Sequence, residues 1–398
     1  MTGNVIDPIG ATVHQSRPKK AASPMNREFV VATRVVSGLG ALGALPTELV
    51  KLSAERIVVV ADQGVSDVGL LEKILARIPD GLIVARCLVG PNPDVHTVEL
   101  ASEQARLARA DVVLAVGGGS ALGAAKAVAI RLTNPRRIDE YEGVGRVPNM
   151  PAPTVAVPTT AGSGSEVSTV LVLHEEGRAE ELVVRSPGCE PRVAILDGTV
   201  LRNLPWAPLV FASLDALSHC IESTWTRRQT LFTESLALRA AQTIIDALPV
   251  AVEGVASGRN ASGENDATLQ LLLEASCAAN MACGNSGLAL VHALSTAPSV
   301  HIAHGLQNGI LLPHVALFNA EVTTAAARVL VSQLDSLYAR IGFTATFSGG
   351  AVGPEESEAM IAASTGHPFR KNNLREATDD ELRSILRNAG AVVDRLKG

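Results

Sequence analysis

The chain has 398 residues, which is more than one ordinary core accommodates and favours two domains. Hydrophobic residues make up 47% and charged residues 19%, a balance typical of a well-packed globular protein. The formal net charge is −6 and there is no basic block, which argues against nucleic acid as a partner. No run of about 18 consecutive apolar residues suggests a membrane span, so we expect no membrane partner.

The N-terminal stretch is polar, contains prolines and lacks the apolar segment of a signal peptide. Residues 1–28 are therefore predicted to form a flexible extension. The number of cysteines is odd, and they are scattered without a CxxC pair, which favours reduced thiols and a cytoplasmic location. These cysteines are Cys87, Cys189, Cys220, Cys277 and Cys283.

Residues 29–205 alternate short aliphatic runs with helical stretches. Such alternation, with continuously apolar strands, predicts a parallel sheet covered on both faces by helices. We therefore expect an α/β, Rossmann-like nucleotide-binding domain. The predicted strands are residues 56–62, 81–90, 111–120, 154–160 and 192–198.

The pattern changes near Pro205, and long alanine- and leucine-rich helical stretches follow. Residues 206–398 are therefore predicted to form an all-α domain that carries the metal and substrate sites. Two domains in close contact leave a cleft between them, which is a common place for a ligand.

A glycine loop lies in VLAVGGGSALGAAK, residues 113–126, which reads as a strand, a tight turn and a helix. Glycines let the backbone approach a phosphate, and the helix N-terminus offers free N–H groups. Gly118, Gly119 and Ser120 are therefore candidate cofactor ligands. The loop lacks the GxGxxG fingerprint, and a purely structural tight turn is the alternative.

A second polar loop, PTTAGSGSE at residues 158–166, also follows a strand directly. Its hydroxyls and bare N–H groups suit a nucleotide, so Thr159, Thr160 and Ser163 are candidates, with a flexible surface loop as the alternative. Asp62 ends the first predicted strand and could accept the ribose hydroxyls of NAD while repelling the extra phosphate of NADP. NAD is therefore the preferred cofactor over NADP, although Asp62 could also be a helix N-cap.

The predicted helix around SLDALSHCIES, residues 213–223, places Asp215 and His219 four residues apart on one face. The helix is apolar nearly all round, and a buried carboxylate and imidazole need either a metal or each other as partners. His292 lies late in another apolar helix, and His304 stands at a predicted helix start. Together the four side chains offer one oxygen and three nitrogens, which suits Zn²⁺ or Fe²⁺ with a position open for substrate.

Six motifs together resemble the iron-containing (group III) alcohol dehydrogenase family, within the dehydroquinate-synthase-like fold, from about Val31 to the C-terminus. They are GGGSALGAAK, PTTAGSGSEV, PRVAILD, LDALSHCIE, GNSGLALVHAL and HGLQNGILLPHV. The resemblance implies that the N-terminal domain binds NAD(P), with Lys126 kept from the glycine-loop pattern as a further cofactor residue. It also implies that Asp215, His219, His292 and His304 hold the metal while His301 does not, and that the protein is a homodimer.

Three positions depart from the family pattern. Gly123 replaces the acid of the glycine loop, and Glu181 stands where members usually carry a lysine. Thr296 stands where the family usually has a histidine assigned to proton relay. Thr296 through its hydroxyl, or His301 through its imidazole, is therefore the candidate catalytic proton carrier.

The resemblance implies an NAD(P)- and metal-dependent oxidoreductase that interconverts a small alcohol and its aldehyde or ketone. The first alternative is a maleylacetate-type reductase acting on a carboxylate-bearing keto acid, because that branch also tends to have a glycine at Gly123 and an arginine at Arg185. It typically lacks the full metal set, so we rank it second. The remaining alternative is a catalytically impaired homologue that only binds a nucleotide.

Overall fold

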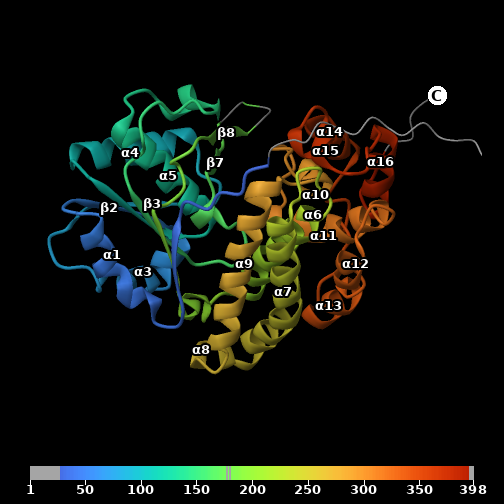
Figure 1. The fold of residues 1–398 in the computed structure, drawn as a ribbon, viewed down its shortest axis with the longest axis horizontal. Coiled ribbons are helices and arrows are strands. Elements are labelled where there is room, and N and C mark those ends of the chain that lie inside the picture. The colour runs from blue at the N-terminus through green and yellow to red at the C-terminus, as the bar shows by residue number, and fades with distance from the viewer. Residues whose placement is uncertain (1–26, 176–177, 179–180, 394–398) are drawn as a thin grey trace, which may run out of the picture.

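The computed structural model describes residues 27–175, 178 and 181–393. The expected extension over residues 1–28 therefore lies outside the described residues, apart from its last two. Figure 1 shows a half built on a parallel sheet, in blue to green, beside a helical half in yellow to red.

The main sheet has six parallel strands in the order β1-β9-β6-β4-β2-β3. Four of them, β2, β4, β6 and β9, are almost wholly buried, which explains their continuous runs of aliphatic residues. The predicted α/β class and all five predicted strands are confirmed. The strands are β1 Arg34–Ser37, β2 Ile57–Asp62, β3 Ile83–Val89, β4 Val112–Gly117, β6 Thr154–Pro158 and β9 Val193–Leu196.

Helices cover both faces of this sheet, and the helices α4 and α5 pack together on one of them. The chain runs from β2 to β3 on one side of β2 and then crosses back to β4 on the other side. The carboxyl ends of β2 and β4 therefore flank a topological switch point, where ligands bind in open α/β sheets. The helices are α1 Leu45–Lys51, α2 Gln63–Asp67, α3 Leu70–Leu75, α4 Val95–Leu107 and α5 Gly119–Thr133.

Four strands were not predicted from the sequence. Strand β1 is a short, partly exposed edge strand, and the other three form a separate sheet in the order β5-β8-β7. Strands this short produce only weak alternation. Their bounds are β5 Gly143–Val144, β7 Val170–Leu173 and β8 Leu182–Arg185.

The second half is helical, as predicted, with helix α6 at its centre. The long helices α7 and α9 pack against α6 and against each other, and α11 lies along α6 as well (Figure 1). The bounds are α6 Trp206–Ser223, α7 Leu231–Ser257, α8 Arg259–Ser262, α9 Asp266–Ser286, α10 Leu290–Leu294, α11 His304–Phe318, α12 Ala325–Val331, α13 Leu334–Ile341, α14 Pro354–Ser364, α15 Pro368–Asn372 and α16 Asp379–Asn388.

Helix α7 is long and apolar enough, by length and composition alone, to cross a membrane. Half of its most apolar window is buried inside the protein, as in the core helix of a globular protein. This helix is therefore weak evidence for a membrane span.

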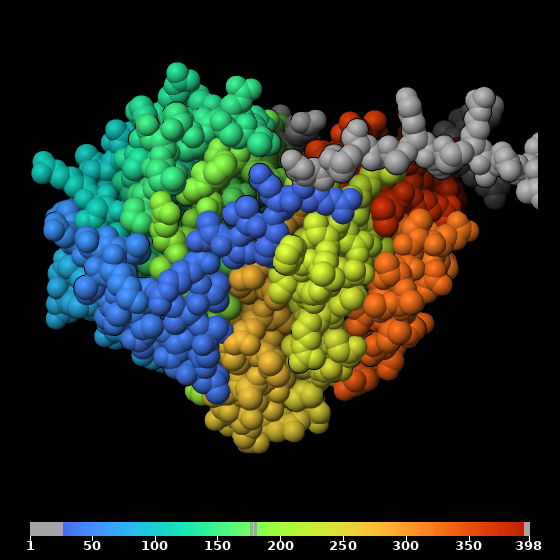
Figure 2. Space-filling view, viewed as in Figure 1, coloured from blue at the N-terminus to red at the C-terminus, as the bar shows by residue number. Residues whose placement is uncertain are grey.

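The first described residues tie the two halves together. Figure 2 shows this blue segment running from the sheet half across the surface of the helical half. The backbone N–H of Val30 donates to Asn285 Oδ1 at 2.7 Å, and the ring of Phe29 lies 5.6 Å from that of Phe232. The segment therefore fixes the edge of the sheet against α7 and α9.

Candidate nucleotide and metal site

The two predicted cofactor loops lie side by side at the carboxyl edge of the sheet. Strands β4 and β6 pair in register, with Gly117 opposite Pro158, so the chain enters both loops at the same edge. A Cβ on Gly119 would lie only 2.8 Å from Ser163 Oγ. The glycine is required there because the loops approach more closely than a side chain allows.

Helix α5 begins at Gly119, with Gly118 as its N-cap, so its first N–H groups face the edge where the loops meet. The Ser120 hydroxyl accepts a hydrogen bond from the N–H of Asn92 at 3.1 Å. Ser120 therefore also fixes the loop that follows β3.

Asp62 ends β2 at this same edge, but its carboxylate already has partners. Oδ1 accepts hydrogen bonds from the N–H groups of Gly64 and Val65 at 2.8 and 3.3 Å. Asp62 is thus the N-cap of α2, which is the alternative that the sequence left open. A ribose hydroxyl would have to share this carboxylate with the helix.

Lys126 is buried in α5, below the two loops. Its Nζ donates to Ser165 Oγ and to the carbonyl of Val170, both at 2.9 Å. Burial lowers the pKa of Lys126 to about 7, although the nearby Glu166 opposes this shift. Lys126 therefore stabilises the second loop from inside the protein through these two hydrogen bonds.

The second polar loop also contacts the helical half directly. A Cβ on Gly162 would lie 2.7 Å from that of Ala212, one turn before Asp215 on α6. Asn280 of α9 donates from Nδ2 to the carbonyl of Ser163 at 2.8 Å. The loop is thus clamped between the sheet edge and the helix that carries the first two predicted metal ligands.

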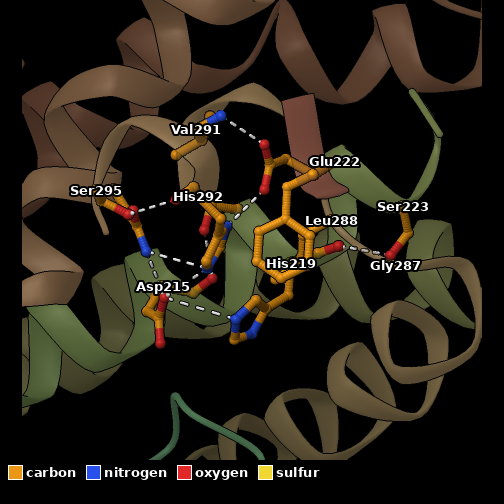
Figure 3. Close-up of polar contacts among 12 residues, drawn as sticks. Asp215, His219, Glu222, Ser223, Gly287, Leu288, Val291, His292 and Ser295 are labelled. Atoms are coloured by element: carbon orange, nitrogen blue, oxygen red, sulfur yellow. Dashed lines mark hydrogen bonds and ion pairs between the residues drawn. The ribbon is translucent and has the colours of Figure 1, made fainter. Parts of the chain in front are cut away.

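All four predicted metal ligands meet beside this loop. Asp215 and His219 come from α6, His292 from α10 and His304 from the first position of α11. Asp215 Oδ1 lies 3.7 Å from His219 Nε2, 3.4 Å from His292 Nε2 and 3.7 Å from His304 Nε2. Figure 3 shows the side chains of Asp215 and His219, from α6, converging with that of His292, from α10.

Close helix packing brings His304 into the cluster. A Cβ on Gly305 would lie 2.2 Å from the carbonyl oxygen of Phe211, so α11 approaches the backbone of α6 as only glycine permits. The His304 side chain is 50% exposed, whereas Asp215, His219 and His292 are nearly inaccessible. The open side of the cluster is therefore the side of His304.

The donors fit a divalent metal. Four ligands about 2.0–2.2 Å from one tetrahedral metal lie roughly 3.3–3.6 Å apart, close to the separations between Asp215 and the three histidines. One donor atom from each of Asp215, His219 and His292 also falls within 4.8 Å of the other two. A set of one carboxylate and three imidazoles suits Fe²⁺ or Zn²⁺.

Glu222 is a site residue that sequence reasoning missed. It is fully buried, and its Oε2 lies 2.5 Å from His292 Nδ1 while Oε1 accepts from the N–H of Val291 at 2.6 Å (Figure 3). This contact keeps the proton on Nδ1 and leaves Nε2 of His292 for a metal. A signal was present, because Glu222 follows Asp215 by seven residues and His219 by three, on the same face of α6.

The protonation of the cluster reflects burial and charge acting together. Burial opposes the charged form of His292, but the carboxylates of Glu222 and Asp215 outweigh it and raise its pKa to about 9. Burial lowers the pKa of His219 to about 4, with Asp215 only partly compensating. For Asp215, burial acts to raise the pKa, but the surrounding imidazoles hold it well below its usual range. In the absence of bound metal, Asp215 is therefore ionised beside a protonated His292, and a metal would replace the proton on His292 Nε2.

The two predicted proton carriers lie outside this cluster of donors. Helix α10 ends at Leu294, so Thr296 does not share a helix face with His292 as a four-residue spacing suggests. The Thr296 hydroxyl donates to the carbonyl of Ala293 at 3.2 Å. His301 is exposed.

The apolar helix expected around His292 is interrupted, because α9 ends at Ser286 and α10 is a separate helix.

The other departures lie near the nucleotide loops or at the surface. A Cβ on Gly123 would meet only the carbonyl of Val172, at 3.9 Å, so the missing acid leaves room beside α5. Burial raises the pKa of Glu181 to about 7. Arg185, the arginine on which the maleylacetate-type alternative depends, is exposed on β8.

Comparison with known proteins gives concordant matches over both halves. Residues 32–198 match the family model described as iron-containing alcohol dehydrogenase, and residues 209–390 match the C-terminal model of the same family. The chain is 32% identical to a probable alcohol dehydrogenase EutG of Salmonella typhimurium, over 92% of this chain and 95% of that protein. It is 29% identical to the NAD-dependent methanol dehydrogenase of Bacillus methanolicus, over 91% and 99% of the two chains.

The fold is also shared with a solved structure. The sulfoacetaldehyde reductase of Bifidobacterium kashiwanohense, solved in complex with NAD+, superposes with a TM-score of 0.82 and 26% sequence identity, over 92% of this chain and 99% of that one.

Proposed function

Because the chain belongs to the iron-containing alcohol dehydrogenase family, we propose that it interconverts a small alcohol and its aldehyde or ketone, with NAD as hydride carrier and a divalent metal. The observation that carries this proposal is the four-donor cluster of Asp215, His219, His292 and His304 beside the polar loop at the sheet edge. A nucleotide bound along the two loops would reach the open side of that cluster.

The chemistry divides between the bound groups and the chain. A metal held by the four donors supplies a Lewis acid that polarises a substrate oxygen, and nicotinamide carries the hydride. Glu222 keeps His292 in the tautomer that presents Nε2 to the metal. The glycine loop and the N-terminus of α5 would bind the phosphates, while Thr159, Thr160 and Ser163 would orient the nucleotide.

We propose that the proton moves at the exposed edge of the cluster, with Thr296 or His301 as carrier. The Thr296 oxygen retains acceptor capacity, because its one hydrogen is donated to Ala293. His301 is exposed and can exchange protons with water.

We also propose NAD over NADP, because Asp62 places a negative charge at the end of β2. Iron is the metal that the family name implies, and zinc accepts the same donors. The homodimer and the cytoplasmic location remain proposals. All five cysteines are buried and form no disulfide with one another, which supports the location.

Oxidation of NADH and NADPH by the purified protein, with bound metal quantified, tests the function. The substrates are small aldehydes, ketones and keto acids, including maleylacetate. Turnover lost with the metal would support the proposal. Turnover on maleylacetate that is indifferent to metal would instead favour the maleylacetate-type alternative, and bound metal and cofactor without turnover would favour an impaired homologue.

A further inference from the structure

Asn308 lies at the centre of the donor cluster without belonging to the predicted ligand set. It is fully buried on α11, one turn after His304. Its Nδ2 lies 2.7 Å from Asp215 Oδ1, 3.1 Å from His292 Nε2 and 3.0 Å from His304 Nε2. A single amide nitrogen therefore contacts three of the four donors.

These three contacts are not equivalent. A histidine that binds a metal through Nε2 directs its lone pair at the metal, so it cannot also accept a hydrogen bond there. The carboxylate oxygen of Asp215 has a second lone pair and can accept from Asn308 while it binds a metal. Of the three contacts, the one between Asn308 and Asp215 is therefore the one that can persist when a metal is bound.

Asp215 has a particular need for such a partner. Its Oδ1 is the atom that faces all three imidazoles, at 3.4–3.7 Å. Rotation of the carboxylate about its terminal torsion would replace that atom by Oδ2 or turn the group away from the histidines, because such torsions have broad minima. A donor fixed by burial on a neighbouring helix opposes that rotation.

We infer that Asn308 is a positioning residue that fixes the Asp215 carboxylate toward the three histidines and thereby sets the affinity of the site for its metal. This role rests on the proposed metal-dependent function. The orientation of the amide agrees with it. Nδ2 rather than Oδ1 faces the Asp215 carboxylate, at 2.7 Å, and the amide nitrogen is the end of the side chain that can donate to it.

Cobalt is a suitable probe, because Co²⁺ accepts the same donors and its visible absorption reports their geometry. Asn308→Leu removes the donor at similar volume, and Asn308→Ala removes it without adding bulk. Gln307→Leu is the matched control, since Gln307 is a buried amide on the same helix whose Nε2 donates to the carbonyl of Ile302 at 2.8 Å.

We expect both Asn308 variants to bind Co²⁺ about 10–100-fold more weakly and to show shifted cobalt absorption bands. The Gln307 control should match the parent, and all variants should bind NADH as the parent does. An Asn308→Ala variant with parental Co²⁺ affinity would overturn the positioning role alone. A parent protein that binds no Co²⁺ would overturn the proposed function as well.

Discussion

The sheet half and the helical half build their sites from different materials. At the sheet edge, the candidate nucleotide site consists mainly of backbone, shaped by Gly118 and Gly119 and by loops that follow β4 and β6. In the helical half, the candidate metal site consists of side chains buried on α6, α10 and α11. One site is a partly buried edge lined mainly by backbone, and the other is a charged cluster in an apolar core.

This difference has an energetic consequence. Backbone N–H groups at a loop cost little to leave exposed to water, whereas buried charges are tolerated only when each is paired. Substitutions at the metal site should therefore lower both the free energy of unfolding and the affinity for metal. Substitutions at the loops should weaken nucleotide binding alone. The following substitutions test that separation.

The largest effect is expected for His292→Ala. It removes a metal ligand and leaves Glu222, which is fully buried, without its imidazole partner. We expect turnover to fall by roughly 10³-fold, because the metal supplies several kcal/mol of stabilisation, and stability to fall by about 3–5 kcal/mol. Metal analysis and urea unfolding measure the two losses, and unchanged stability would contradict a paired buried carboxylate.

Glu222→Gln should weaken the metal site without dismantling it. The amide keeps the shape and an oxygen acceptor but removes the charge that supports His292. Metal affinity is expected to fall about 10–100-fold, as for other outer partners of metal-binding histidines. NADH affinity, measured by fluorescence titration, should not change. An equal loss of both affinities would break the separation between the halves.

Gly119→Ala tests the opposite half. The added Cβ would lie 2.8 Å from Ser163 Oγ and force the two loops apart. NADH is expected to bind about tenfold more weakly, a cost of about 1.4 kcal/mol, while metal content stays at the parental level. Gly123→Ala on the same helix is the control, because its Cβ would meet only the carbonyl of Val172 at 3.9 Å. Control and variant with the same NADH affinity would argue against the loop contact.

The smallest effect concerns Glu181, whose pKa burial raises to about 7 from a usual 4.5. Between pH 4.5 and 7 the unfolded carboxyl ionises while the folded one keeps its proton, so the free energy of unfolding falls as pH rises through this window. Glu181→Gln should therefore be about 1–2 kcal/mol more stable than the parent at pH 8 and nearly equal to it at pH 4.

Urea unfolding at the two pH values measures this difference. Glu103→Gln, at an exposed position on α4, is the control. A stabilisation of Glu181→Gln that is the same at both pH values would exclude titration of this carboxyl as its cause.

The sequence by itself determined the fold class and the five main strands, and its motifs singled out the four candidate metal donors. Continuous apolar runs such as those of β2 and β4 signal buried parallel strands, and the four-residue spacing of Asp215 and His219 is a property of any helix. Local periodicity and motif resemblance were sufficient because each strand and each motif is contained within a short segment.

Only the tertiary structure decided which partners those residues have. It placed Glu222 behind His292 and Asn308 among the donors, because those contacts join α6 to α10 and α11 across 70 and 93 residues of chain. It also gave Asp62 a helix-capping role and placed Thr296 beyond the end of α10. These contacts depend on how distant segments pack, which local patterns such as hydrophobic periodicity do not predict.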